Sequence, residues 1–115
     1  MKEIKFRVWS ISKSGNNGTM HYLKSKDSLQ DLIEKERWKV MQFTGLKDKN
    51  GVPIYEGDII EDNPGGKLNR YEVKYEKKYG RFCLDNYQGD TYGLQNSKRY
   101  IEVIGNVWEN SDLLK

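Results

Sequence analysis

Four carboxylates lie close together in the middle of the chain, and their chemistry could support an activity. They are Glu56, Asp58, Glu61 and Asp62. Paired carboxylates can exchange protons with a substrate or hold magnesium, so a metal-dependent enzyme is one hypothesis. We favour a structural role, because Asp58 follows Gly57 at a predicted bend and can accept hydrogen bonds from backbone N–H groups there. We therefore expect no catalytic residue and no metal site.

The single cysteine and the single histidine, Cys83 and His21, offer little more. They could form a nucleophile–base pair only if the fold brought them together. Cys83 lies between Phe82 and Leu84 in a predicted strand, on the opposite face, and we interpret it as a small filler or a half-exposed thiol. One histidine and one cysteine are also too few for a structural zinc site, which usually has four such ligands. We expect no cofactor.

A segment rich in lysine and tyrosine is the best candidate for a binding site. Its candidate residues are Lys74, Lys77, Lys78, Tyr79 and Arg81. Lysine and arginine neutralise phosphates and aromatic rings stack on bases, so nucleic acid is one candidate partner. The alternative is that these lysines keep an edge strand soluble, because Glu72, Glu76 and Asp85 lie close by in the sequence.

Composition limits the class of protein. The 115 residues fit one domain, 1–115, in which about 1–42 form an N-terminal part and about 43–115 a β-barrel portion. The net charge of +3 and the pI of about 8.9 permit a polyanionic partner without requiring one. One cysteine allows no internal disulfide, which favours a reduced, cytoplasmic setting. No apolar run is long enough for a membrane span, and no signal peptide is evident, so we expect no membrane partner.

The elements that would position these residues are mostly short strands. Alternating apolar and polar residues predict a strand over 3–8. A cluster of Gly, Asn and Ser predicts a loop or hairpin tip over 12–19, and residues 20–23 would form the returning strand. Capping signals and apolar spacing predict one helix over 28–37. Further strands are predicted over 38–43, 58–61 and 100–109, and a hairpin over 70–85 that turns at Tyr79 and Gly80. Residues 86–99 are predicted to be a polar loop, and the last residues a terminal turn.

Between residues 43 and 58 the sequence carries turn signals. Asn50 and Gly51 both tolerate positive φ and predict a hairpin, whereas Pro53 restricts its strand to an edge. The calcium-loop spacing that begins at Asp48 fails, because its twelfth position is Ile59 and not a carboxylate. At least six strands and one helix therefore predict a mainly β fold. We expect an SH3-like small barrel or a strongly bent antiparallel sheet, with an N-terminal β–α addition.

Three segments resemble the YopX family. They are EIKFRVW from Glu3, MQFTGLKDKNGVPIYEGDII from Met41 and VIGNVWENSDLL from Val103, and the resemblance extends over residues 3–114. It implies a small β-rich protein of phage or prophage origin, mainly from Gram-positive bacteria. It implies no established activity, cofactor or catalytic residue. No family motif matches residues 67–99.

We therefore expect a non-enzymatic binding or assembly module. Unpaired edge strands favour a homo-oligomer, and a phage or host protein is another candidate partner. The alternatives are a small β-barrel that binds nucleic acid through the basic–aromatic hairpin and, less favoured, a metal-dependent enzyme.

Overall fold

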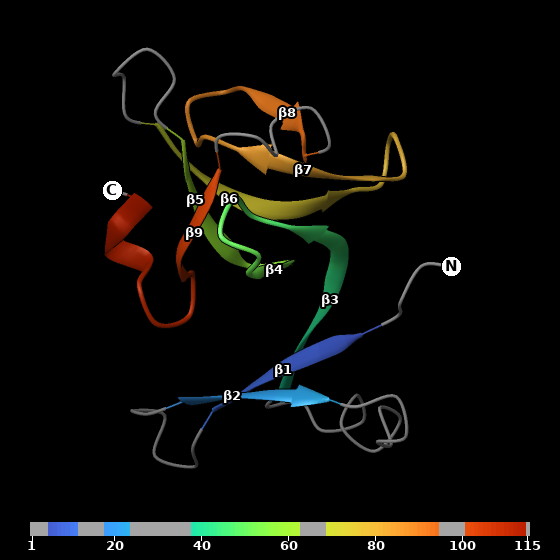
Figure 1. Ribbon diagram of the computed structural model, residues 1–115, viewed down its shortest axis with the longest axis vertical. Helices are drawn as coiled ribbons and strands as arrows, with labels where there is room; N and C mark the ends of the chain where they lie inside the picture. The colour runs from blue at the N-terminus through green and yellow to red at the C-terminus, as the bar shows by residue number, and fades with distance from the viewer. Residues whose placement is uncertain (1–4, 12–17, 24–37, 63–68, 95–100, 115) are drawn as a thin grey trace.

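The computed structural model describes residues 5–11, 18–23, 38–62, 69–94 and 101–114. Within these ranges the protein is mainly β (Figure 1). The elements are β1 Phe6–Ile11, β2 Gly18–Leu23, β3 Trp38–Lys47, β4 Pro53–Tyr55, β5 Asp58–Asp62, β6 Asn69–Glu76, β7 Arg81–Asp85, β8 Thr91–Gly93, β9 Glu102–Asn106 and the 3-10 helix η3 Ser111–Leu114. No helix in the described ranges is long and apolar enough to span a membrane.

A four-stranded antiparallel sheet has the order β2-β1-β3-β4. The pairing of β1 with β2 confirms the two predicted strands, although β1 extends to Ile11 and β2 already begins at Gly18, inside the segment predicted to be a loop. The rest of the loop predicted over 12–19 lies outside the described residues. The consecutive side chains of Val8 and Trp9 on β1 are both buried, so both faces of this strand are covered. The helix predicted over 28–37 lies outside the described residues, so the N-terminal β–α addition stays a prediction.

The long strand β3 joins this sheet to the rest of the molecule (Figure 1). Its first half pairs with β1, and its second half pairs with β4 across a register shift between Phe43 and Lys47. Gly45 within the shift has a φ of 87°, which glycine adopts without steric cost. The prediction that this strand ends at residue 43 is wrong, because the bulge lets the strand continue while changing its partner.

A five-stranded antiparallel sheet, of order β8-β7-β6-β5-β9, curls into a half-barrel (Figure 1). Its concave face holds the main hydrophobic core, to which Ile54 of β4 and Leu46 of β3 contribute from the other sheet. The core residues are Ile54, Ile60, Tyr71, Val73, Leu84, Leu94 and Ile101. The strongly bent sheet expected from the sequence is therefore present. The comparison with an SH3-like barrel stays a prediction.

The β6–β7 hairpin confirms the prediction for residues 70–85, and β4 lies at the sheet edge, as Pro53 indicates. Two predictions nearby need correction. Strand β8 lies inside the segment predicted to be a loop, because the tight turn at Asn86–Asp90 returns the chain to β7. The last strand ends at Asn106, not at residue 109, because the Asn106 side chain accepts the N–H groups of Trp108 and Glu109 and forms a turn.

Candidate functional site

The carboxylates of the central segment hold separate parts of the fold. Asp58 is buried, and its Oδ1 accepts a hydrogen bond from Arg7 Nη2 at 2.7 Å while its Oδ2 accepts the Tyr55 N–H at 2.8 Å. The same guanidinium also donates to the Glu56 carbonyl at 3.0 Å and lies 4.8 Å from the centre of the Tyr55 ring. Burial raises the pKa of the Asp58 carboxyl, and the Arg7 charge and the Tyr55 N–H oppose that rise. This buried ion pair ties β1 to the turn between β4 and β5.

The other members of the carboxylate cluster point to different partners. Glu56 Oε1 accepts the Gln42 N–H at 2.8 Å, and Glu61 pairs with Arg70 at 3.1 Å. Asp62 accepts a hydrogen bond from Asn69 Nδ2 at 3.1 Å. Throughout the described ranges, no three His, Cys, Asp or Glu side chains converge as metal ligands would. The structure therefore does not bring the four predicted carboxylates to one site.

Cys83 and His21 lie on different sheets. Cys83 is buried on β7, so of its two predicted roles the structure favours the small filler, and burial raises the pKa of its thiol. His21 Nε2 lies 3.2 Å from Ser10 Oγ on the neighbouring strand β1. This arrangement separates the two groups that a Cys–His pair would require.

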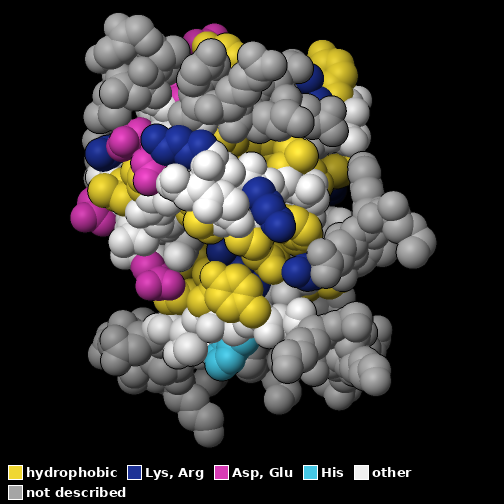
Figure 2. Space-filling model, viewed as in Figure 1, with side chains coloured by type: hydrophobic (Ala, Val, Ile, Leu, Met, Phe, Trp, Pro, Cys, Tyr) yellow, Lys and Arg dark blue, Asp and Glu magenta, His cyan; other side chains and the backbone are white. Residues whose placement is uncertain are grey.

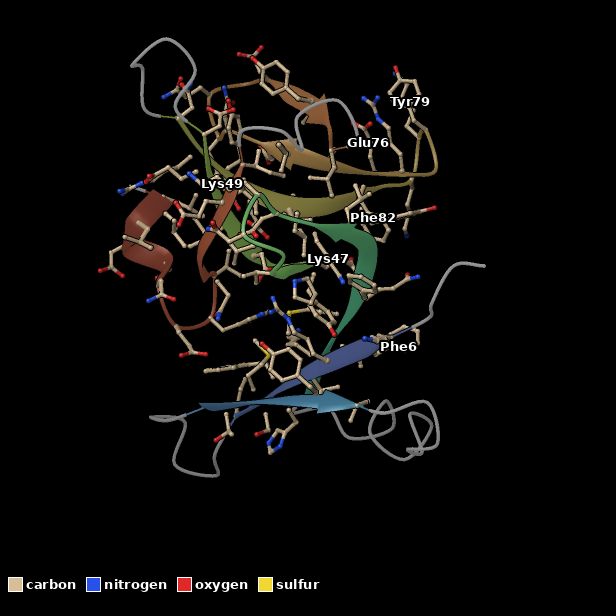
Figure 3. All side chains as sticks on the ribbon, viewed as in Figure 1. Phe6, Lys47, Lys49, Glu76, Tyr79 and Phe82 are labelled. Carbon is tan, nitrogen blue, oxygen red and sulfur yellow. The ribbon has the colours of Figure 1, made fainter. Side chains whose placement is uncertain are left out.

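The five predicted nucleic-acid-binding residues all lie on the β6–β7 hairpin, but they divide into separate groups. Lys74 Nζ pairs with Asp85 at 2.8 Å, and Arg81 Nε pairs with Glu76 at 2.9 Å. Tyr79 is 60% exposed at the hairpin tip (Figure 3), with the Lys78 ammonium 5.4 Å and the Arg81 guanidinium 5.1 Å from its ring centre. Carboxylates therefore pair with Lys74 and Arg81, whereas Lys77 and Lys78 at the tip have no carboxylate partner among the described residues.

A groove of about 470 Å³ lies where β3, β6 and the segment after β9 approach one another. Apolar side chains of Met41, Val73, Val107 and Trp108 line it. The Trp108 ring is stacked on Trp9 at a centroid distance of 6.3 Å, and its Nε1–H points at Met41 Sδ, 3.1 Å away. On the face shown in Figure 2, hydrophobic side chains are visible between the two sheets, with lysine or arginine side chains beside them. The groove thus combines fixed aromatic and aliphatic surface with neighbouring positive charge.

The charged side chains along the groove differ in the partners that they have within the protein. Lys39 and Lys77 are exposed there, and among the described residues neither ammonium group has a carboxylate partner. Both acids of the groove accept a hydrogen bond from a neutral group, Glu56 from the Gln42 N–H and Glu72 from the Tyr87 hydroxyl, and neither has a lysine or arginine partner in the described part of the chain. Burial raises the pKa of the Glu72 carboxyl, against the effect of the nearby Lys74. Two cations therefore remain available to a ligand.

Sequence reasoning identified Lys77 as part of a binding surface but missed Lys39, Trp108 and the groove itself. These residues come from three segments far apart in the chain, and each has an ordinary local context. In the WKVM and NVWE segments, β-forming and apolar residues predict only a strand, and nothing in either segment points to a shared site. No local signal in the sequence could have joined them.

The fold and the groove define a small, mainly β protein with an open groove where β3, β6 and the segment after β9 approach one another. The chain belongs to the YopX family, whose model, described as YopX protein, matches residues 2–115. This confirms the resemblance seen in the sequence.

Two solved structures are similar in fold. Protein EF1440 from Enterococcus faecalis is 25% identical with a TM-score of 0.61, and the match covers 100% of both chains. Protein yopX from Bacillus subtilis is 22% identical with a TM-score of 0.57, covering 96% of this chain and 95% of that one. No curated protein sequence matches the chain.

Proposed function

We propose that this YopX-family protein is a non-enzymatic binding and assembly module, and that its partner binds in the groove between β3, β6 and Trp108. The observation that carries the proposal is the combination of an apolar lining with the two exposed lysines, Lys39 and Lys77. Concave apolar surface with a few polar groups is the usual composition of a binding site.

The partner in this proposal is a phage or host protein. Three lysines and two glutamates line the groove, which leaves a formal charge of only +1. A nucleic acid gains most of its affinity from phosphate neutralisation, so this small excess favours a protein partner. The phage or prophage origin implied by the family resemblance, together with a single cysteine, supports the cytoplasm of the host bacterium as the setting.

Reversing one groove charge tests this function. We expect the immobilised protein to capture a protein partner from nuclease-treated extracts of Bacillus subtilis or Enterococcus faecalis, the bacteria with similar structures. Lys39→Glu should lose the captured protein. Lys47→Glu is the matched control, because Lys47 is an exposed lysine on the same strand but does not line the groove. Equal capture by both variants, or capture only from extracts that were not treated with nuclease, would contradict the proposal.

Nucleic-acid binding at the hairpin tip is a second candidate function, supported by the exposed Tyr79 ring with Lys78 and Arg81 close to it. It predicts that a fluorescent single-stranded oligonucleotide binds at low salt and dissociates as salt rises. Replacing Lys77, Lys78 and Arg81 by alanine should weaken that binding at least about tenfold, whereas Lys47→Ala should not. Absence of binding at low salt would remove this candidate.

A further inference from the structure

One wall of the groove is a strand edge whose backbone has no partner among the described residues. Strand β5 begins at Asp58, opposite the middle of β6, and Gly57 adds one more hydrogen bond, from its N–H to the Val73 carbonyl at 2.9 Å. Strand β6 continues to Glu76 with only β7 beside it. The end of β6 therefore has an open edge, and Tyr75 of this edge lines the groove.

The direction of the Tyr75 backbone groups follows from strand geometry. In a β-strand, alternate residues direct their N–H and C=O groups to the same side. The Val73 carbonyl faces Gly57, on the side away from β7, so the N–H and C=O of Tyr75 face that side too. The N–H and C=O of Lys74 and Glu76 face β7 instead, where Cys83 and Arg81 lie opposite them.

The opposite wall has a similar open edge on β3. The Phe43 N–H bonds to the Lys5 carbonyl at 2.8 Å, while the Gln42 carbonyl accepts the Glu56 N–H on the other side at 3.0 Å. Val40 has the orientation of Gln42, so its backbone groups point away from β1. No described strand pairs with Val40 on that side, and Val40 also lines the groove.

We propose that an extended, acidic segment of a partner protein enters this groove and pairs as an added strand with the Tyr75 edge of β6. The inference rests on the proposed function, because it specifies the ligand of the same groove. Main-chain hydrogen bonds to an exposed sheet edge supply affinity in this recognition mode, and neighbouring pockets select alternate side chains. Here Met41, Val73 and Trp108 would contact apolar side chains, and Lys39 and Lys77 would contact carboxylates.

The charges of the groove favour this occupant over the others. Lys39 and Lys77 have no carboxylate partner among the described residues, so each can pair with one carboxylate of the ligand, whereas the groove's formal charge of only +1 disfavours a nucleic acid. A second copy of the chain and a nucleic acid remain outcomes of the test.

The test uses the whole protein and a synthetic peptide, Glu-Val-Asp-Val-Glu-Val-Asp, with blocked ends. Amide exchange measured by NMR should be fast for Tyr75 and slow for Lys74 and Glu76 in the free protein. Added peptide should slow the exchange of the Tyr75 amide at least about tenfold. A peptide with lysine in place of each acid should bind at least about tenfold more weakly, and so should the acidic peptide with N-methylated backbone amides.

Two substitutions at one position separate strand pairing from side-chain contact. Tyr75→Pro removes the N–H that faces the groove and leaves the β6–β7 hydrogen bonds in place, since an edge strand tolerates proline there. Tyr75→Ala keeps that N–H and removes the ring. We expect the alanine variant to retain peptide binding and the proline variant to lose it. Exchange of the Lys74 and Glu76 amides reports whether each variant keeps its hairpin.

The outcomes distinguish the inference from the proposed function. Peptide binding that Lys39→Glu weakens, without slower Tyr75 exchange, would overturn strand addition and leave groove binding standing. Absence of peptide binding, or equal binding of the lysine peptide, would overturn the inference. Slow Tyr75 exchange that depends on protein concentration alone would identify a second copy as the occupant. Displacement of the peptide by an oligonucleotide would favour nucleic acid. Either result would overturn the proposal that an acidic segment of a partner protein occupies the groove.

Discussion

Asp48 illustrates how a single side chain fixes a turn and a long-range contact together. Its Oδ1 accepts the N–H groups of Asn50 and Val52 at 2.8 and 2.9 Å, which closes the turn between β3 and β4. Its Oδ2 accepts the Val103 N–H of β9 at 2.9 Å. The carboxylate that resembled the start of a calcium loop therefore binds backbone groups, and it fastens one sheet to the other.

Replacing Asp48 by asparagine should lower the free energy of unfolding by about 1–3 kcal/mol, because the amide nitrogen cannot accept a hydrogen bond from Val103 or the turn. Chemical denaturation monitored by tryptophan fluorescence measures this loss. Asp112→Asn, in the exposed first turn of η3, is the control and should change stability by less than about 0.5 kcal/mol.

The same variant should alter the pH dependence. Burial acts to raise the pKa of Asp48, but the hydrogen bonds from Val103, Val52 and Asn50 outweigh it and leave the pKa below the usual 3.8. A carboxyl with a lowered folded pKa contributes stability above its unfolded pKa and loses it as the pH falls through the folded value. Stability should therefore decline below about pH 4 less steeply in Asp48→Asn than in the native protein. Equal slopes would contradict this role.

The turn between β4 and β5 is the element that shapes the groove wall. Gly57 there has a φ of 85°, and a Cβ at this position would lie 2.9 Å from Met41 Sδ. Gly45 in β3 has nearly the same φ, 87°, but its Cβ would meet nothing within 4 Å. Alanine substitutions at Gly57 and at Gly45 can therefore be compared to separate the cost of backbone strain from the cost of crowding against Met41.

Gly57→Ala should therefore destabilise the protein more than Gly45→Ala. We expect about 1–3 kcal/mol for each from the backbone conformation, since side chains disfavour this region. Gly57→Ala should add a further cost of about 1 kcal/mol or more, because Met41 must move. Parallel thermal and urea unfolding of the two variants measures the difference. Equal destabilisation would show that Met41 yields without cost.

At the scale of the whole molecule, strand β3 and the Arg7–Asp58 pair hold the four-stranded sheet on the half-barrel. Each sheet still has two edge strands with one described neighbour, β2 and β4 in the first sheet and β8 and β9 in the second, and none of the described residues that line the groove comes from these four strands. Open edges favour association with another chain. These edges are separate from the groove proposed to receive a partner segment.

The homo-oligomer expected from the sequence is tested by light scattering. We expect a solution mass that is a multiple of the 13.5 kDa chain and that is unchanged in Lys39→Glu, because the proposed self-association uses other edges. A monomer at every accessible concentration would remove the assembly part of the proposed function. A mass that falls only in Lys39→Glu would assign the groove to self-association.

The sequence by itself determined the local structure. Alternating residues specified the β1–β2 and β6–β7 hairpins, and Asn50 with Gly51 specified the turn before β4, because these signals act over a few neighbouring residues. It also identified the family and the five candidate residues of one hairpin. It did not predict the ion pairs of Lys74 and Arg81, because these pairs depend on the register between strands β6 and β7.

The tertiary structure alone decided which distant residues meet. Arg7 and Asp58 are 51 positions apart, and Asp48 and Val103 are 55 apart, so neither contact has a local signal. The groove depends on three separate segments, and its open edge exists because β5 begins at Asp58 while β6 runs on to Glu76. Strand pairing and burial bring these distant residues together, and both depend on how the whole chain folds.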